Sequence, residues 1–104
     1  MDPTEKIILW LIANSLGGVN RGRIITEILK RPQNAHELSK SLRLEYKTVR
    51  HHLRVLEENN LLTHVGKKYG CVYFPSIDLE RKQDFFLEIW NRFGKNQING
   101  EGQE

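Results

Sequence analysis

Residues 46–60 read YKTVRHHLRVLEENN and residues 61–75 read LLTHVGKKYGCVYFP, and these two adjacent stretches decide the fold. The first has apolar or inward-facing positions at the three- and four-residue spacing of one α-helical face, namely Val49, His52, Leu53 and Leu56. The second has two runs rich in β-branched and aromatic residues, separated by the glycine-bounded turn at residues 66–70. Such a pattern is typical of a β-hairpin. We therefore expect a helix followed directly by a hairpin.

A shorter helix is predicted just before this pair. Asn34 and Glu37 have the three-residue spacing of a capping box, so a helix is expected to begin after Asn34. Leu38 and Leu42 would then lie on its inner face, and residues 43–45 form a short connection to the next helix. Two helices joined by a tight turn and followed by a hairpin predict a winged helix-turn-helix.

The ends of the chain predict further helices. The first is expected from an N-cap at Thr4 to Leu16, before Gly17-Gly18, and a second from an N-cap at Asn20 to residue 30. A last helix is expected from a cap at Ser76 or Asp78 through Phe93. The predicted fold is mainly α with a small β-hairpin, a winged helix-turn-helix with additional N- and C-terminal helices. It would occupy residues 1–93, followed by a flexible, polar and glycine-rich tail at 94–104.

Positive charge is concentrated in the centre of the chain. Residues 20–75 carry eleven Lys or Arg against five acids, whereas both ends are net acidic and the whole chain of 104 residues has a net charge of +3. A basic centre between acidic ends suggests a polyanionic partner, although an ordinary solvated surface has the same composition.

The face of the 46–59 helix opposite its apolar side carries cationic and hydrogen-bonding groups. They are Tyr46, Lys47, Arg50, His51 and Arg54, with Thr48 at the edge. Arginine and lysine bind guanine acceptors in the major groove, and tyrosine and threonine bind phosphates. This helix is therefore predicted to be a recognition helix in the major groove of double-stranded DNA. The hairpin turn at 66–70, through Lys67 and Lys68, would lie on the flanking backbone or in the minor groove.

The stretch Asn34–Asp78 resembles the ArsR-like winged-helix transcription regulators, especially their archaeal branch. The matching pieces are AHELSKSLRL, YKTVRHHLRVLEENNLL and KKYGCVYFPS. The resemblance implies a homodimer on a palindromic or pseudopalindromic DNA site, with the first and last helices forming the interface, and it places the DNA contacts on the helix face described above. Glu45 departs from the family pattern, because glutamate is a poor N-cap.

The terminal helices favour dimerisation independently of the resemblance. The first is apolar nearly all round and the last carries several large aromatics, so a monomer would expose an apolar patch. Packing of the two helices within one chain is the alternative. The predicted interface residues are Ile8, Trp10, Leu11, Phe85, Phe86, Ile89, Trp90 and Phe93.

Other functional classes find little support in the sequence. The single cysteine, Cys71, excludes an internal disulfide and a cysteine-rich metal site, and is typical of a cytoplasmic protein. His51 and His52 diverge on a helix, and Asp84 with Glu88 is typical of a solvated face. The glycines fit neither a phosphate loop nor a dinucleotide fingerprint, and the apolar run Ile7–Ala13 is too short to cross a membrane.

We therefore predict a cytoplasmic DNA-binding transcription regulator, a repressor acting as a homodimer, with no cofactor, no metal, no membrane partner and no enzymatic activity. The alternative is a winged-helix module that binds another protein through its terminal helices.

Overall fold

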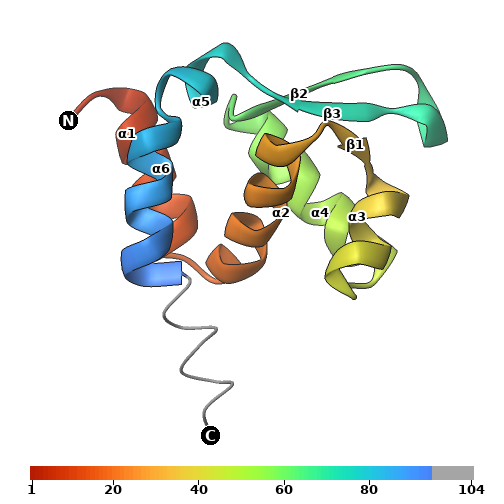
Figure 1. The fold of residues 1–104 in the computed structure, drawn as a ribbon, viewed down its shortest axis with the longest axis horizontal. Helices are drawn as coiled ribbons and strands as arrows, with labels where there is room; N and C mark the ends of the chain where they lie inside the picture. The colour runs from red at the N-terminus through yellow and green to blue at the C-terminus, as the bar shows by residue number, and fades with distance from the viewer. Residues whose placement is uncertain (95–104) are drawn as a thin grey trace, which may run out of the picture.

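Two helices of equal length, α2 (Gly18–Lys30) and α4 (Tyr46–Glu58), occupy the centre of the molecule (Figure 1). The computed structural model describes residues 1–94, apart from the side chain of Tyr69. Helix α3 (Ala35–Leu42) packs on α4 at one end. At the other end α1 (Pro3–Ile8), with the π-helical turn η1 (Leu9–Ala13), lies beside α6 (Gln83–Ile89) and its π-helical continuation η3 (Trp90–Gly94). The predicted class, mainly α with a small sheet in a winged helix-turn-helix, is confirmed.

The sheet has three strands within residues 1–94, one more than the sequence predicted. Strands β2 (Leu62–Val65) and β3 (Val72–Pro75) form the expected hairpin, and the 3-10 turn η2 (Lys68–Gly70) lies between them. Strand β1 (Gln33–Asn34) pairs antiparallel with the other edge of β3, giving the order β1-β3-β2. Two residues are too few for an alternating pattern, so the sequence carried no signal for β1. We call residues 62–75 the wing.

Buried aliphatic side chains from the central helices form the core. Ile24, Ile25 and Ile28 of α2 meet Val49, Leu53 and Leu56 of α4, and all six are 0–1% exposed. The terminal helices extend the same core through Ile8, Leu11 and Phe86. This continuous packing fixes α4 from behind.

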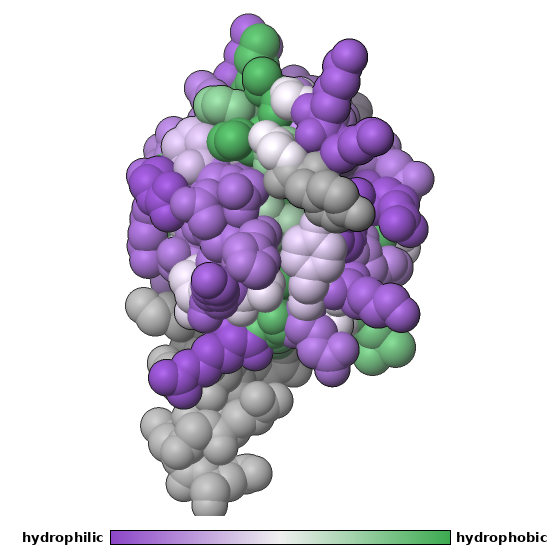
Figure 2. Space-filling model, turned by 90° about the vertical axis from the view of Figure 1, so that its right-hand side faces the viewer, coloured by the Kyte–Doolittle hydropathy of each residue, from purple (hydrophilic) through white to green (hydrophobic). Residues whose placement is uncertain are grey.

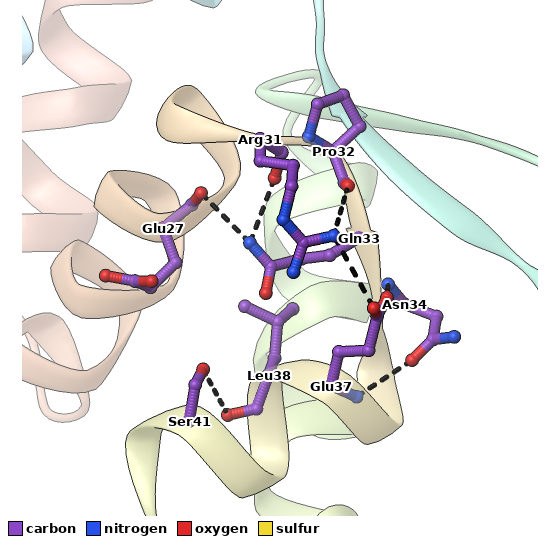
Figure 3. A network of polar contacts seen from close by, with 8 residues as sticks. All are labelled: Glu27, Arg31, Pro32, Gln33, Asn34, Glu37, Leu38 and Ser41. Carbon is purple, nitrogen blue, oxygen red and sulfur yellow. Dashed lines mark hydrogen bonds and ion pairs between the residues drawn. The ribbon is translucent and has the colours of Figure 1, made fainter.

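The connection between α2 and α3 is held by the buried Gln33 (Figure 3). Its side-chain amide donates to the carbonyl oxygens of Glu27, at 3.0 Å, and of Arg31, at 2.9 Å. Next to it the predicted capping box is confirmed. The Asn34 side chain accepts a hydrogen bond from the backbone N–H of Glu37, and the Glu37 carboxylate accepts one from the backbone N–H of Asn34. Burial of the Gln33 amide is thus compensated by carbonyls at the end of α2.

Several predicted boundaries at the ends of the chain were wrong. The first helix is capped by Asp2, not Thr4, because Asp2 and Glu5 form a capping box around Pro3 at the first helical position. That helical segment ends at residue 13, and α2 begins at Gly18 because Gly17 adopts the left-handed conformation, with φ of 83°.

The last predicted helix is divided at Lys82. Ser76 caps α5 (Ile77–Arg81), as predicted, but Lys82 leaves the helical conformation before α6 begins. The Lys82 ammonium lies 2.8 Å from Asp2 and 3.4 Å from Glu5, so the break is joined to the start of α1 by ion pairs. Of the predicted flexible tail, residues 95–104 lie outside the described part of the chain.

Candidate nucleic-acid interface

Helix α4 presents a line of polar side chains directly opposite its buried face. At about 100° per residue, Lys47, His51 and Arg54 point away from the core residues Val49 and Leu56. All three are exposed. Glu45 gives α4 no side-chain cap, as its poor capping propensity predicts, yet the helix begins at Tyr46. The sequence therefore located this helix and the exposed positions of Lys47, His51 and Arg54.

The flank of α4 nearest the wing behaves differently. Arg50 is partly buried, and its Nη1 donates a hydrogen bond of 3.1 Å to the hydroxyl of Tyr73, a buried residue of β3. Burial raises the pKa of Tyr73, so this phenol stays neutral and accepts from Arg50. Tyr46, at the start of the same flank, is 37% exposed and its ring centroid lies 6.4 Å from that of His36. Thr48, on the opposite flank, is partly buried.

A pocket of about 290 Å³ lies between α4 and the wing. Its principal polar lining residues are Arg50, Arg54 and Glu57 from α4 and His64, Lys68 and Tyr73 from the wing. We call it the α4–wing pocket. The Glu57 carboxylate lies 2.5 Å from His64 Nδ1, which joins α4 to β2. Arg50, Arg54 and Lys68 therefore line the α4–wing pocket, and the carboxylate of Glu57 is in contact with His64.

The wing turn carries the two lysines predicted to contact DNA. Lys67 and Lys68 are both exposed, and Gly66 turns the chain with a φ of 103°. The turn projects from the end of the molecule that also carries α3 (Figure 1). Seen from that end, the surface is predominantly hydrophilic, with hydrophobic residues gathered at the top and smaller hydrophobic areas lower down (Figure 2).

Buried Arg21 contacts the inner face of α4, a role that was not predicted from the sequence. Arg21 of α2 is 5% exposed. Its guanidinium donates to the carbonyl oxygens of Leu11, at 3.1 Å, and Leu16, at 2.7 Å, and to the Ser15 hydroxyl, at 2.6 Å. The same group lies 3.3 Å from Nδ1 of His52, on the inner face of α4. Arg21 thus connects the turn after η1 to the predicted recognition helix.

His52 is held neutral in this network. Burial, together with the smaller electrostatic effects of Arg21 and His51, lowers the pKa of His52 to about 4. Neutral imidazole leaves Nδ1 free to accept from Arg21. A signal for Arg21 did exist, because it shares the four- and seven-residue spacing of Ile25 and Ile28 on the buried face of α2.

Most of the residues predicted for a dimer interface are buried within the single chain. Ile8, Leu11, Phe86, Ile89 and Trp90 are 0–8% exposed within their own chain. Phe85 is partly buried. Trp10 and Phe93 are 56% and 48% exposed. Packing within one chain therefore covers the first five, and Trp10 and Phe93 lie on the surface.

Metal ligands do not gather anywhere in residues 1–94, where no group of three or more His, Cys, Asp and Glu residues has a metal-binding arrangement. The Cys71 thiol is buried beside the α4–wing pocket and donates to the Gly66 carbonyl at 3.5 Å. In the same part of the chain each helix is too short, or too polar, to span a bilayer.

A winged helix-turn-helix with an exposed cationic helix is an architecture of DNA-binding transcription regulators. Residues 19–64, from α2 into β2, match the family described as "Bacterial regulatory protein, arsR family". Among solved structures, the chain is similar to Staphylococcus aureus MarR in complex with salicylate and kanamycin, with 20% sequence identity and a TM-score of 0.59. The similarity covers 82% of this chain but only 57% of the MarR chain. No curated protein matches.

Proposed function

We propose that this protein is a cytoplasmic, sequence-specific DNA-binding transcription regulator that places α4 in the major groove of double-stranded DNA. The observation that carries the proposal is the exposed line of Lys47, His51 and Arg54, lying opposite the buried face of a helix fixed by core packing. The family match over residues 19–64 supports it. Kinship with the archaeal branch stays a prediction.

We assign the predicted contacts to two roles. Arg54, Lys47 and His51 have the hydrogen-bonding groups and the exposure to contact base edges. Thr48 and Tyr46 lie on the two flanks of α4, and we assign them to phosphates beside the groove, which hydroxyl groups commonly bind.

Selection of bound sequences from random duplex DNA tests the proposal. We expect enrichment of a defined motif, and we expect the affinity for that motif to decrease steeply with salt, because phosphate contacts release counterions. Failure of any sequence to be enriched, together with no measurable binding at low salt, would contradict it.

Replacing both wing lysines, Lys67→Ala with Lys68→Ala, is expected to weaken binding to all sequences to the same extent. Each lost phosphate contact should reduce the slope of log K against log salt by roughly 0.9. Fluorescence anisotropy at four salt concentrations measures this change. The matched control is Lys6→Ala with Arg81→Ala, which removes two exposed cations beside the terminal helices. An unchanged slope in the wing variant would show that the wing does not contact phosphate.

We further propose that the regulator acts as a homodimer and represses transcription by occupying its site. Trp10 and Phe93 on the terminal helices, and Leu16 in the turn after η1, which is 96% exposed, are exposed apolar residues that a second copy could cover. Sedimentation equilibrium at micromolar concentration should give twice the mass of the chain, and the selected motif should contain two half-sites. A monomer that binds no DNA would instead favour the alternative, a module that binds another protein.

A further inference from the structure

Arg50 differs from the outward-facing residues of α4 because the wing holds its side chain. It lies about 70° around the helix from the midline of Lys47, His51 and Arg54. Its guanidinium donates to the Tyr73 hydroxyl across the gap between α4 and β3. A side chain held in this way is directed into the α4–wing pocket, which Arg50 lines, and away from the outward midline of α4.

The charges around the α4–wing pocket favour an anion. Arg50 and Lys68 contribute positive charges from the two walls of the pocket, and Arg54, which belongs to the outward line of α4, also borders it. Glu57 is the acidic residue among the lining side chains, and its carboxylate is in contact with His64. A guanidinium whose plane is fixed by a neutral acceptor keeps its remaining N–H groups available for a phosphate.

The Tyr73 hydroxyl is suited to fixing Arg50 without neutralising it. A carboxylate at this position would cancel the charge, whereas the phenol, whose pKa is raised by burial, stays uncharged. Tyr73 itself cannot move freely, because it is 5% exposed and lies in β3 between β1 and β2. Arg50 is therefore attached to the most constrained strand of the sheet.

We propose that the α4–wing pocket binds one phosphate of the DNA backbone, with Arg50 as its principal ligand and Tyr73 as the positioning residue for Arg50. The inference rests on the proposed function and changes the role predicted for Arg50 from the sequence. Arg50 supplies affinity and sets the angle between α4 and the wing on the duplex. Base recognition belongs to the outward line of α4.

Methylphosphonate scanning of the selected duplex tests the contact directly. Replacing the phosphates one at a time with neutral methylphosphonate should identify a position at which the wild-type protein loses roughly tenfold in affinity. The affinity of Arg50→Ala for the unmodified duplex should be lower by a similar factor. Neutralising that phosphate should reduce the affinity of this variant little further. Arg81→Ala, an exposed arginine on α5, should behave as the wild type.

Tyr73→Phe tests the positioning role, because it removes only the hydroxyl from a buried ring. We expect a several-fold loss of affinity on the unmodified duplex and a smaller effect of neutralising the same phosphate, with an unchanged melting temperature and unchanged base preference. If the effect of the phosphate is the same in wild type and in Tyr73→Phe, Tyr73 does not position Arg50.

The pocket could instead bind a free phosphate ion, and titration with inorganic phosphate distinguishes this from binding of a DNA phosphate. Titrating the protein with phosphate at constant ionic strength should give no saturable change in the ring signals of Tyr73 by nuclear magnetic resonance. Saturation at millimolar phosphate would assign the pocket to a free anion and overturn the DNA contact. Arg50→Ala variants that bind DNA normally but change the preferred base would also overturn it, while leaving the proposed function intact. Absence of any selected duplex would instead reject the proposed function.

Discussion

Lowering the pH from 7 to about 4 is expected to reduce the free energy of unfolding by about 3 kcal/mol through His52 alone. The pKa of His52 falls from its ordinary value of 6.5 to about 4 in the folded protein. Between these values the unfolded chain binds a proton that the folded chain does not. Stability is therefore complete above about pH 6.5, decreases as the pH falls, and has lost this contribution below about 4.

Chemical denaturation at a series of pH values measures the effect, and His52→Asn isolates it. The Asn oxygen is expected to accept from Arg21 in place of Nδ1, without titrating in this range. The variant should be less stable at pH 7 because it packs less well, but its stability should change little down to pH 4.5. The pKa values of Asp2 and Glu37 are lowered, so protonation of these carboxylates reduces stability only at more acidic pH.

The exposed His36 provides the matched control, since His36→Asn should retain the wild-type dependence on pH. Parallel curves for wild type and His52→Asn between pH 7 and 4.5 would contradict the assignment of a neutral, buried imidazole to His52.

Gly22→Ala is expected to reduce the free energy of unfolding by about 1–2 kcal/mol. A methyl group on Gly22 would lie 2.2 Å from Cζ3 and 2.3 Å from Cε3 of Trp90, well inside van der Waals contact. Trp90 is 7% exposed and stacked on Phe86, so its ring has little room to move. Overpacking of this kind costs about 1–3 kcal/mol, and the gain in helix propensity on replacing glycine offsets only about 0.5–1 kcal/mol.

Thermal and urea denaturation of Gly22→Ala and Gly70→Ala, measured together, test this prediction. Gly70, at the end of the wing turn, has no atom within 4 Å of an added Cβ, so its substitution should leave stability nearly unchanged. Equal stability of Gly22→Ala and the wild type would show that Trp90 does not pack closely against α2. The close approach of α2 to η3 depends on the absence of a side chain at this position.

The elements with strong local signals were predictable from the sequence. The capping box at Asn34 and Glu37 is formed by residues three apart, and the buried face of α4 follows a single helical period. Such features depend on residues close together in the sequence, so they can be predicted from it. The exposed positions of Lys47, His51 and Arg54 follow from the same period.

Features that depend on contacts between distant residues were not predictable in this way. The spacing of Arg21 with Ile25 and Ile28 indicates the buried face of α2, but only the fold brings Leu11, Leu16 and His52 around its guanidinium. Tyr73 resembled an ordinary strand aromatic, and its contact with Arg50 spans 23 positions. Arg50 was therefore grouped with the outward-facing residues, although it lies on the flank of α4 that is turned to the wing. Sequence periodicity gives the direction of a side chain but not its partner.

The partner against which the terminal helices pack was likewise not predictable from the sequence. The sequence showed that Ile8, Phe86 and Trp90 needed to be covered, but not by what. In the structure their own chain covers them, which leaves Trp10 and Phe93 as exposed aromatics.

The preference of the Arg54→Ala variant for the selected DNA motif over single-base variants of it tests the central claim most directly. Arg54 lies on the exposed midline of α4, so its loss should cost roughly 1–3 kcal/mol on the selected motif and relax the preference at one base pair of each half-site. Arg81→Ala should retain both the affinity and the preference. An Arg54→Ala protein that keeps the complete wild-type preference would contradict the assignment of α4 as the helix that reads DNA.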